Sequence, residues 1–102
     1  MNEEARADGF AAGDDGERWT FSGTLTFENA EGVLERAAPL ALPRSGVVDL
    51  AGLSHADSAA LAVLLALKRR ATEEGATLDF ASVPESIVSL ARVYGVYALV
   101  GI

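Results

Sequence analysis

The sequence of 102 residues contains no cysteine and one histidine, His55. Without cysteine the chain forms no disulfide and carries out no thiol redox chemistry, and a single histidine is a poor basis for a zinc site. No stretch approaches the ~18 apolar residues of a membrane span, and residues 1–17 lack the apolar core of a secretory signal. We therefore expect no metal or cofactor and a cytoplasmic location.

Basic side chains are scarce. Eight Lys and Arg stand against fifteen Asp and Glu, which gives a net charge of −7, and residues 1–17 hold six of the acids beside Arg6 alone. Such a balance argues against binding to nucleic acid and against direct adhesion to anionic lipid. We expect an acidic arm over residues 1–17, in which Phe10–Ala12 can add a short edge strand, and one domain over residues 18–102.

Motifs of catalysis are also missing. The sequence has no Gly-x-Ser-x-Gly elbow and no glycine-rich phosphate loop ending in Lys-Ser or Lys-Thr. His55, Asp57 and Ser58 lie within four residues of one another, whereas working triads bring such groups together from separate segments. We expect no enzyme, and any nucleotide hydrolysis would belong to a partner.

Alternating hydrophobic periods predict an α/β fold. Bulky apolar and polar residues alternate over residues 18–22, and short apolar runs at 47–50 and 77–80 are bounded by turn residues, as in strands. Helical spacing predicts helices from Thr26 to just before Pro39, from Ser58 to about Glu74, and after a capping box at Ser82–Glu85. The order predicts a mostly parallel, mixed sheet of about four strands with an antiparallel edge, packed with three to four helices.

The most informative stretch runs from Val47 to Leu61, where a short buried strand and a tight loop lead to Asp57-Ser58 and a long apolar helix. Asp57 or Ser58 can cap the first unpaired backbone N–H groups of that helix. One interpretation makes Ser58 only part of the cap. The other makes it a switch, because a phosphate there would place about −1.5 to −2 charges at the positive end of the helix dipole.

A helical wheel predicts two faces for the helix that starts at Ser58. The side expected to face the sheet holds Ala60, Leu61, Leu64, Leu67, the stem of Lys68, and Ala71. The outer side carries small, uncharged side chains for two turns, namely Ala59, Ala62 and Ala66, bordered by Ser58. It then becomes charged at Arg69, Arg70 and Glu73. An uncharged alanine stripe indicates either close packing of another protein's helix or simply the high helix propensity of alanine.

The pattern Asp49-Leu50-Ala51-x-Leu53, followed by Asp57-Ser58-Ala59-Ala60-Leu61, resembles the STAS domain of anti-sigma factor antagonists and of sulfate-transporter tails. In that family Asp-Ser or Asp-Thr opens the second helix, and partners bind around its start. Ala60 departs from the pattern, which more often has Gly there. The resemblance implies a STAS-like fold and a non-catalytic, protein-binding role.

Two stretches resemble one branch of this family, MlaB, the small STAS subunit of the Mla phospholipid-transport ABC systems of Gram-negative bacteria. They are Asp57–Leu65 and Leu90–Val96, within a resemblance that covers roughly residues 19–100. The resemblance implies binding to the ABC transporter ATPase subunit (MlaF-like) of a membrane complex, and a place peripheral to the inner membrane through that partner. The candidate partner-binding residues are Ser58, Ala59, Ala62, Ala66, Arg69 and His55.

The alternative is an anti-sigma factor antagonist. In that case Ser58 would be phosphorylated by an anti-sigma factor kinase, and the phosphate would release the partner. His55, in the predicted loop, is otherwise expected to hydrogen-bond to backbone or water. The residue that replaces Gly at position 60 and the Leu90–Val96 segment favour the transporter subunit.

Overall fold

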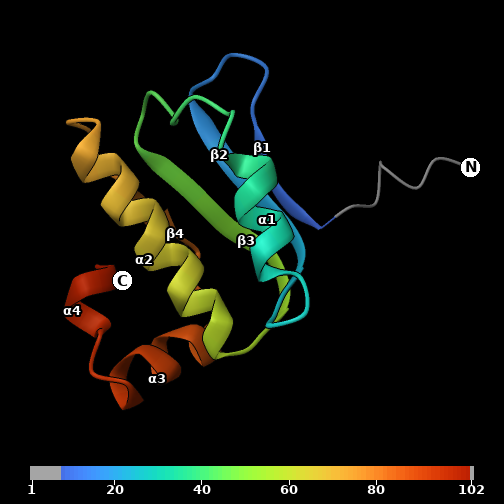
Figure 1. Cartoon of the computed structure of the whole chain (residues 1–102), viewed down its shortest axis with the longest axis vertical. Coiled ribbons are helices and arrows are strands. Elements are labelled where there is room, and N and C mark those ends of the chain that lie inside the picture. Colours follow the sequence, from blue (N-terminus) through green and yellow to red (C-terminus); the bar gives the residue numbers. More distant parts are fainter. Residues whose placement is uncertain (1–7, 102) are drawn as a thin grey trace, which may run out of the picture.

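The computed structural model describes residues 8–101, which form a four-stranded sheet with helices packed against it (Figure 1). The strands lie in the order β1-β2-β3-β4; β1 pairs antiparallel with β2, while β2, β3 and β4 are parallel. This confirms the predicted α/β fold with a mixed, mostly parallel sheet and an antiparallel edge. The elements are β1 Gly9–Ala12, β2 Arg18–Leu25, α1 Ala30–Ala37, β3 Val47–Ala56, α2 Ser58–Glu73, β4 Asp79–Ala81, α3 Glu85–Val93 and α4 Tyr97–Val100.

One face of the sheet carries the core. Along β2 exposed and buried residues alternate, so that Trp19 and Phe21 are buried while Arg18 and Thr20 are exposed. Successive side chains of a strand point to opposite faces, and α1 and α2 lie on the same side of the sheet (Figure 1). The buried aromatic and aliphatic side chains of β2 and β3 therefore pack against these helices. The polar side chains of β2 lie on the opposite face of the sheet.

The central strand β3 is longer than the sequence predicts. A strand over residues 47–50 followed by a tight loop was expected, but pairing with β2 continues to Leu25↔Ala56. The register between β2 and β3 shifts twice, after Thr20 and after Gly23. These irregularities accommodate unpaired residues, so that the pairing continues along β3. The prediction of a loop before Asp57 is therefore wrong, and β3 delivers the chain directly to the start of α2.

Gly52 is required at the first of these shifts. A Cβ atom added to Gly52 would collide with the carbonyl oxygen of Phe21 on the neighbouring strand. Since backbone cannot move aside as a flexible side chain does, we expect Gly52→Ala to lower the free energy of unfolding by roughly 1–3 kcal/mol. Urea denaturation followed by circular dichroism measures this.

Gly32 provides the matched control for Gly52. It lies inside α1, where an added Cβ meets only the end of the Arg36 side chain, and alanine is a better helix former than glycine. Gly32→Ala should raise stability by roughly 0.5–1 kcal/mol. Equal changes in the free energy of unfolding for Gly52→Ala and Gly32→Ala would show that the close approach of Phe21 does not require glycine at position 52.

The first helix begins four residues later than predicted. The Asn29 side chain accepts from the Thr26 N–H (2.9 Å) and donates to the carbonyl of Thr24 (2.8 Å), which holds residues 26–29 in a turn. As a result α1 starts at Ala30, and Phe27 lies in the turn with 86% of its surface exposed. The end of the helix, before Pro39, agrees with the prediction.

The third helix corrects the predicted capping box. Its first residue is Glu85, its N-cap is Pro84 without a side-chain hydrogen bond, and Ser82 has a left-handed backbone with φ 57°. A residue before proline is disfavoured in the helical region, so Val83 cannot begin the helix from a cap at Ser82. The chain turns at Ser82 and the helix starts after the proline.

Arg70 departs from the predicted outer face of α2. Its guanidinium donates to the carbonyl of Ala37, the last residue of α1, and to that of Leu40 beyond the helix, and it pairs with Glu74 at 2.8 Å. Carbonyls at the end of a helix lack partners within the helix, and an arginine satisfies them well. Arg70 thus joins α2 to α1 and is not part of the free outer surface.

Asp8 fastens the edge strand β1. Its carboxylate accepts from the backbone N–H of Thr24 (3.1 Å) and from the Thr24 hydroxyl (2.8 Å), on the neighbouring strand. These hydrogen bonds, the backbone one first, and the nearby Arg36 hold the pKa of Asp8 below its ordinary value of 3.8. Protonation of Asp8 is therefore expected to loosen the β1–β2 edge.

The lowered pKa of Asp8 gives a pH dependence with a definite sign. Its contribution to stability is complete above the ordinary value of 3.8 and is lost as the pH falls through the lower pKa of the folded state. We expect Asp8→Asn to lower the melting temperature at neutral pH, with the difference from the parent chain shrinking in acid. Asp14→Asn, the same charge change on an exposed turn residue, is the matched control.

Candidate functional site

The start of α2 is organised by Asp57. One carboxylate oxygen accepts from the Ala59 N–H at 2.8 Å, and the other accepts from the Phe27 N–H at 3.1 Å. The first bond caps the helix, as predicted for Asp57, and the second ties α2 to the turn after β2. Ser58 is exposed, and its hydroxyl makes no hydrogen bond within residues 8–101. The capping role belongs to Asp57, which leaves the Ser58 hydroxyl available to another molecule.

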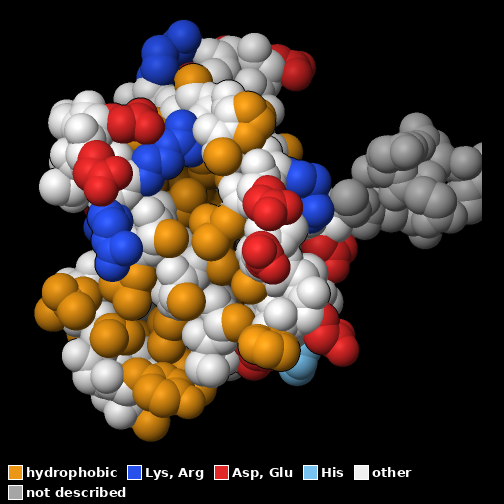
Figure 2. All heavy atoms as spheres, viewed as in Figure 1, with side chains coloured by type: hydrophobic (Ala, Val, Ile, Leu, Met, Phe, Trp, Pro, Cys, Tyr) orange, Lys and Arg blue, Asp and Glu red, His pale blue; other side chains and the backbone are white. Residues whose placement is uncertain are grey.

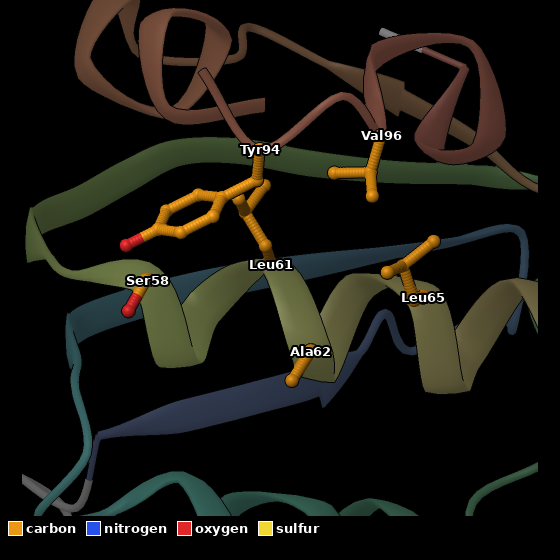
Figure 3. Close-up of a pocket in the computed structure, with 6 residues that line it drawn as sticks. All are labelled: Ser58, Leu61, Ala62, Leu65, Tyr94 and Val96. Carbon is orange, nitrogen blue, oxygen red and sulfur yellow. The ribbon is translucent and has the colours of Figure 1, made fainter. Parts of the chain in front are cut away.

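A groove runs along the N-terminal half of α2. It encloses about 250 Å³ and is lined by Ser58, Leu61, Ala62, Leu65, Tyr94 and Val96. Figure 3 shows the first four residues along α2, with Tyr94 and Val96 facing them from the segment between α3 and α4. The Tyr94 ring lies over Leu61, with its hydroxyl directed to the Ser58 end of the groove. The lining is apolar apart from these two hydroxyl groups.

The groove belongs to a larger apolar surface. Large hydrophobic side chains are exposed on the adjoining elements α3 and α4 and on the segment between them, with Val93 at 79%, Leu99 at 68%, Tyr94 at 59% and Tyr97 at 38%. Figure 2 shows hydrophobic side chains gathered over this region, at the lower left where α3 and α4 approach α2. Exposed apolar side chains that gather in one region are typical of surfaces that bind a partner. We call this region, the groove together with Val93, Tyr97 and Leu99, the α2–α4 surface.

The candidate residues on α2 divide between two sides of the helix. Ser58 and Ala62 line the groove, and exposed Arg69 lies four residues beyond Leu65, on the same helical stripe. Ala59 and Ala66 are only half-buried and lie on the side of α2 that contains Arg70, which is bonded to the end of α1. The structure thus groups Ser58, Ala62 and Arg69 and sets Ala59 and Ala66 apart.

His55 lies near the end of β3, opposite Thr24 of β2, and is exposed. The single histidine appears at the lower right of Figure 2, away from the apolar side chains over α3 and α4. It is therefore not a lining residue of the groove, although it precedes the cap of α2 by two residues.

The side of the groove formed by Tyr94 and Val96 was not anticipated from the sequence. Tyr94 is the C-cap of α3 and is 59% exposed, so it does not belong to the buried face that holds Ile87 and Ala91. Gly95, with φ 71°, ends the helix and returns Val96 toward α2. A signal was present in the Val93-Tyr94-Gly95-Val96 stretch, where bulky apolar residues flank a helix-ending glycine.

The chemistry of this surface makes it a candidate binding site. Within residues 8–101 no group of three or more His, Cys, Asp or Glu side chains is arranged to hold a metal ion. Over the same residues, no helix is long and apolar enough to cross a membrane. The groove offers shape, apolar contact and two hydroxyl groups, which suit the side chains of another protein.

Comparison with known families agrees with this architecture. A family model described as "Mlab, STAS domain" matches residues 10–101, nearly the whole chain, including every element described above except the first residue of β1. No curated protein matches the chain closely enough to count as a relative. The chain belongs to the Mlab, STAS domain family.

Proposed function

We propose that the protein is a non-catalytic STAS subunit that binds the ATPase of a phospholipid ABC transporter and supports its assembly or activity. In this role it is MlaB-like, its partner is MlaF-like, and the transporter serves outer-membrane lipid asymmetry. The protein would be held at the cytoplasmic side of the inner membrane by the partner, because its own net charge of −7 disfavours anionic lipid.

The observation that carries the proposal is the α2–α4 surface with Ser58 at its edge. A hollow of about 250 Å³ beside exposed Tyr94 and Val93 leaves apolar area that a partner would remove from water. The family match supports an ABC transporter partner, since the matching family is described by the name Mlab. Ser58, Ala62 and Arg69 would make the contact.

A second candidate function, an anti-sigma factor antagonist, is supported by one specific feature. The Ser58 hydroxyl is exposed, makes no hydrogen bond within residues 8–101 and stands at the first position of α2. A kinase could reach it, and the added phosphate would stand at the positive end of the helix. Incubation with the anti-sigma kinases of the source organism, followed by mass spectrometry, tests this role; an unmodified Ser58 would end it.

The transporter proposal is tested by affinity purification of the tagged full chain from detergent-solubilised membranes of its host. We expect an ABC ATPase and its permease to be recovered with the parent chain and to be depleted at least tenfold with Ser58→Asp, because a carboxylate at the groove edge would be desolvated by the partner. Ser89→Asp, on an exposed position of α3 outside the groove lining, is the matched control.

Three results have different meanings. Loss of the ATPase with Ser58→Asp, together with its retention with Ser89→Asp, supports the transporter role. Equal recovery with both variants contradicts a contact at Ser58. Recovery of a serine kinase or a sigma-factor regulator, with no ATPase, replaces the transporter proposal by the second function.

A further inference from the structure

The α2–α4 surface is bordered by arginines in an otherwise acidic chain. Arg69 extends the stripe of Ala62 and Leu65 by one helical turn and is exposed. The Arg92 guanidinium lies 4.9 Å from the centre of the Tyr97 ring. Within residues 8–101 the three ion pairs use other arginines, namely Arg18, Arg44 and Arg70.

These two arginines have no carboxylate partner among the described residues, although the chain has fifteen acids against eight bases. Unpaired positive charge at the rim of an apolar surface gives complementarity to a partner that carries negative charge at the same place. A basic partner segment would be repelled by Arg69 and Arg92, whereas Asp or Glu side chains would pair with them. The charge pattern therefore selects an acidic partner segment.

The shape of the groove selects a helix. From Ser58 to Leu65 the lining spans eight residues of α2, roughly 10 Å at a rise of 1.5 Å per residue, or two helical turns. Its volume of about 250 Å³ exceeds the ~150 Å³ that holds a benzene ring in an engineered cavity, so it has room for more than one side chain. Two apolar side chains two turns apart are the anchors by which amphipathic helices bind in grooves.

We propose that the α2–α4 surface receives an amphipathic, acidic helix of the partner. Apolar side chains of that helix, spaced i, i+4 and i+7, lie between α2 and Tyr94–Val96. Asp or Glu side chains about one turn beyond them face Arg69 and Arg92. This inference rests on the proposed function and specifies the partner's docking element.

The charge part of the proposal is tested with the purified complex of the full chain and its ABC ATPase. Arg69→Glu and Arg92→Glu should each raise the Kd on the order of tenfold, since like charges would then meet at the rim. Arg18→Glu, the same charge change on the opposite face of the sheet, should leave the Kd within about twofold. An unchanged Kd for both Arg69→Glu and Arg92→Glu overturns the proposal.

The helix part is tested by a photo-cross-linking residue, p-benzoyl-phenylalanine, placed at exposed Val93 of the intact chain in its host. The cross-linked peptide should have apolar residues at i, i+4 and i+7 with an adjacent Asp or Glu. Changing that acid to Lys should restore binding of Arg69→Glu. A cross-linked segment that is basic, or that alternates as a strand does, contradicts the inference.

The two proposals fail in different ways. A cross-linked acidic amphipathic helix from a protein other than an ABC ATPase would overturn the proposed function and leave the docking element in place. A complex with the ATPase whose cross-linked segment lacks acids or helical spacing would leave the proposed function in place and overturn the docking element.

Discussion

Trp19→Ala is expected to lower the free energy of unfolding by about 3–5 kcal/mol and to move the urea midpoint far below that of the parent chain. Trp19 is fully buried in the middle of the core, and its ring centre lies 5.6 Å from that of Phe10 on the edge strand. Its indole N–H also donates to the Ala41 carbonyl at 3.0 Å, which fastens the segment between α1 and β3. The free energy of unfolding of a domain of this size is about 5–15 kcal/mol, so the substitution removes a large fraction of it.

Trp19→Phe separates the two contributions. It keeps most of the apolar volume but leaves the Ala41 carbonyl without its donor, which costs about 1–3 kcal/mol. Urea denaturation of both variants should be followed by far-ultraviolet circular dichroism, because Trp19 is the only tryptophan and its fluorescence is lost with it. An alanine variant that melts within a few degrees of the parent would show that Trp19 does not anchor the core.

The elements that sequence periodicity predicted well are those with regular spacing. Alternation of buried Trp19 and Phe21 with polar residues predicted β2. The apolar stripe of α2 predicted a helix that starts at Ser58, and the observed helix ends within one residue of the predicted end. These patterns reflect one buried face and therefore follow from the sequence alone. The buried residues of α2, including Leu64 and Leu67, agree with the predicted sheet-facing side.

The elements that were missed depend on contacts between segments distant in the sequence. The extension of β3 needs the register shifts against β2, in which Gly52 accepts the close approach of Phe21. The late start of α1 depends on side-chain hydrogen bonds of Asn29 to Thr24 and Thr26. Neither partner is visible in a local hydrophobic pattern, because tertiary contacts override propensity at such places.

The candidate site shows the same division. Ser58 and Ala62 were found because one helix displays them, and a wheel describes one helix. Tyr94 and Val96 were missed because they reach the groove only after α3 ends at Gly95 and the chain turns back to α2. A groove between two elements requires their relative placement, which the sequence pattern of either one does not contain.

Ala62→Arg is expected to reduce binding of the ABC ATPase by at least a hundredfold while the domain stays folded. Ala62 is exposed on α2 and lines the groove, so an arginine there fills the hollow and adds a charge that the bound partner would bury unpaired. Burial of an unpaired charge costs about 3 kcal/mol or more, which corresponds to more than a hundredfold in Kd. The helix itself tolerates the change, because arginine is a good helix former.

Ala76→Arg supplies the matched control for Ala62→Arg. Ala76 is exposed just after the C-terminal end of α2, where a positive charge suits the helix dipole, and it lies far along the helix from the groove. Equilibrium binding of both variants to the purified ATPase, with melting curves of each, separates loss of contact from loss of fold. If Ala62→Arg binds as tightly as Ala76→Arg while both melt like the parent, the groove is not where the ATPase docks, and the exposed Val93, Tyr94 and Leu99 side chains require another partner.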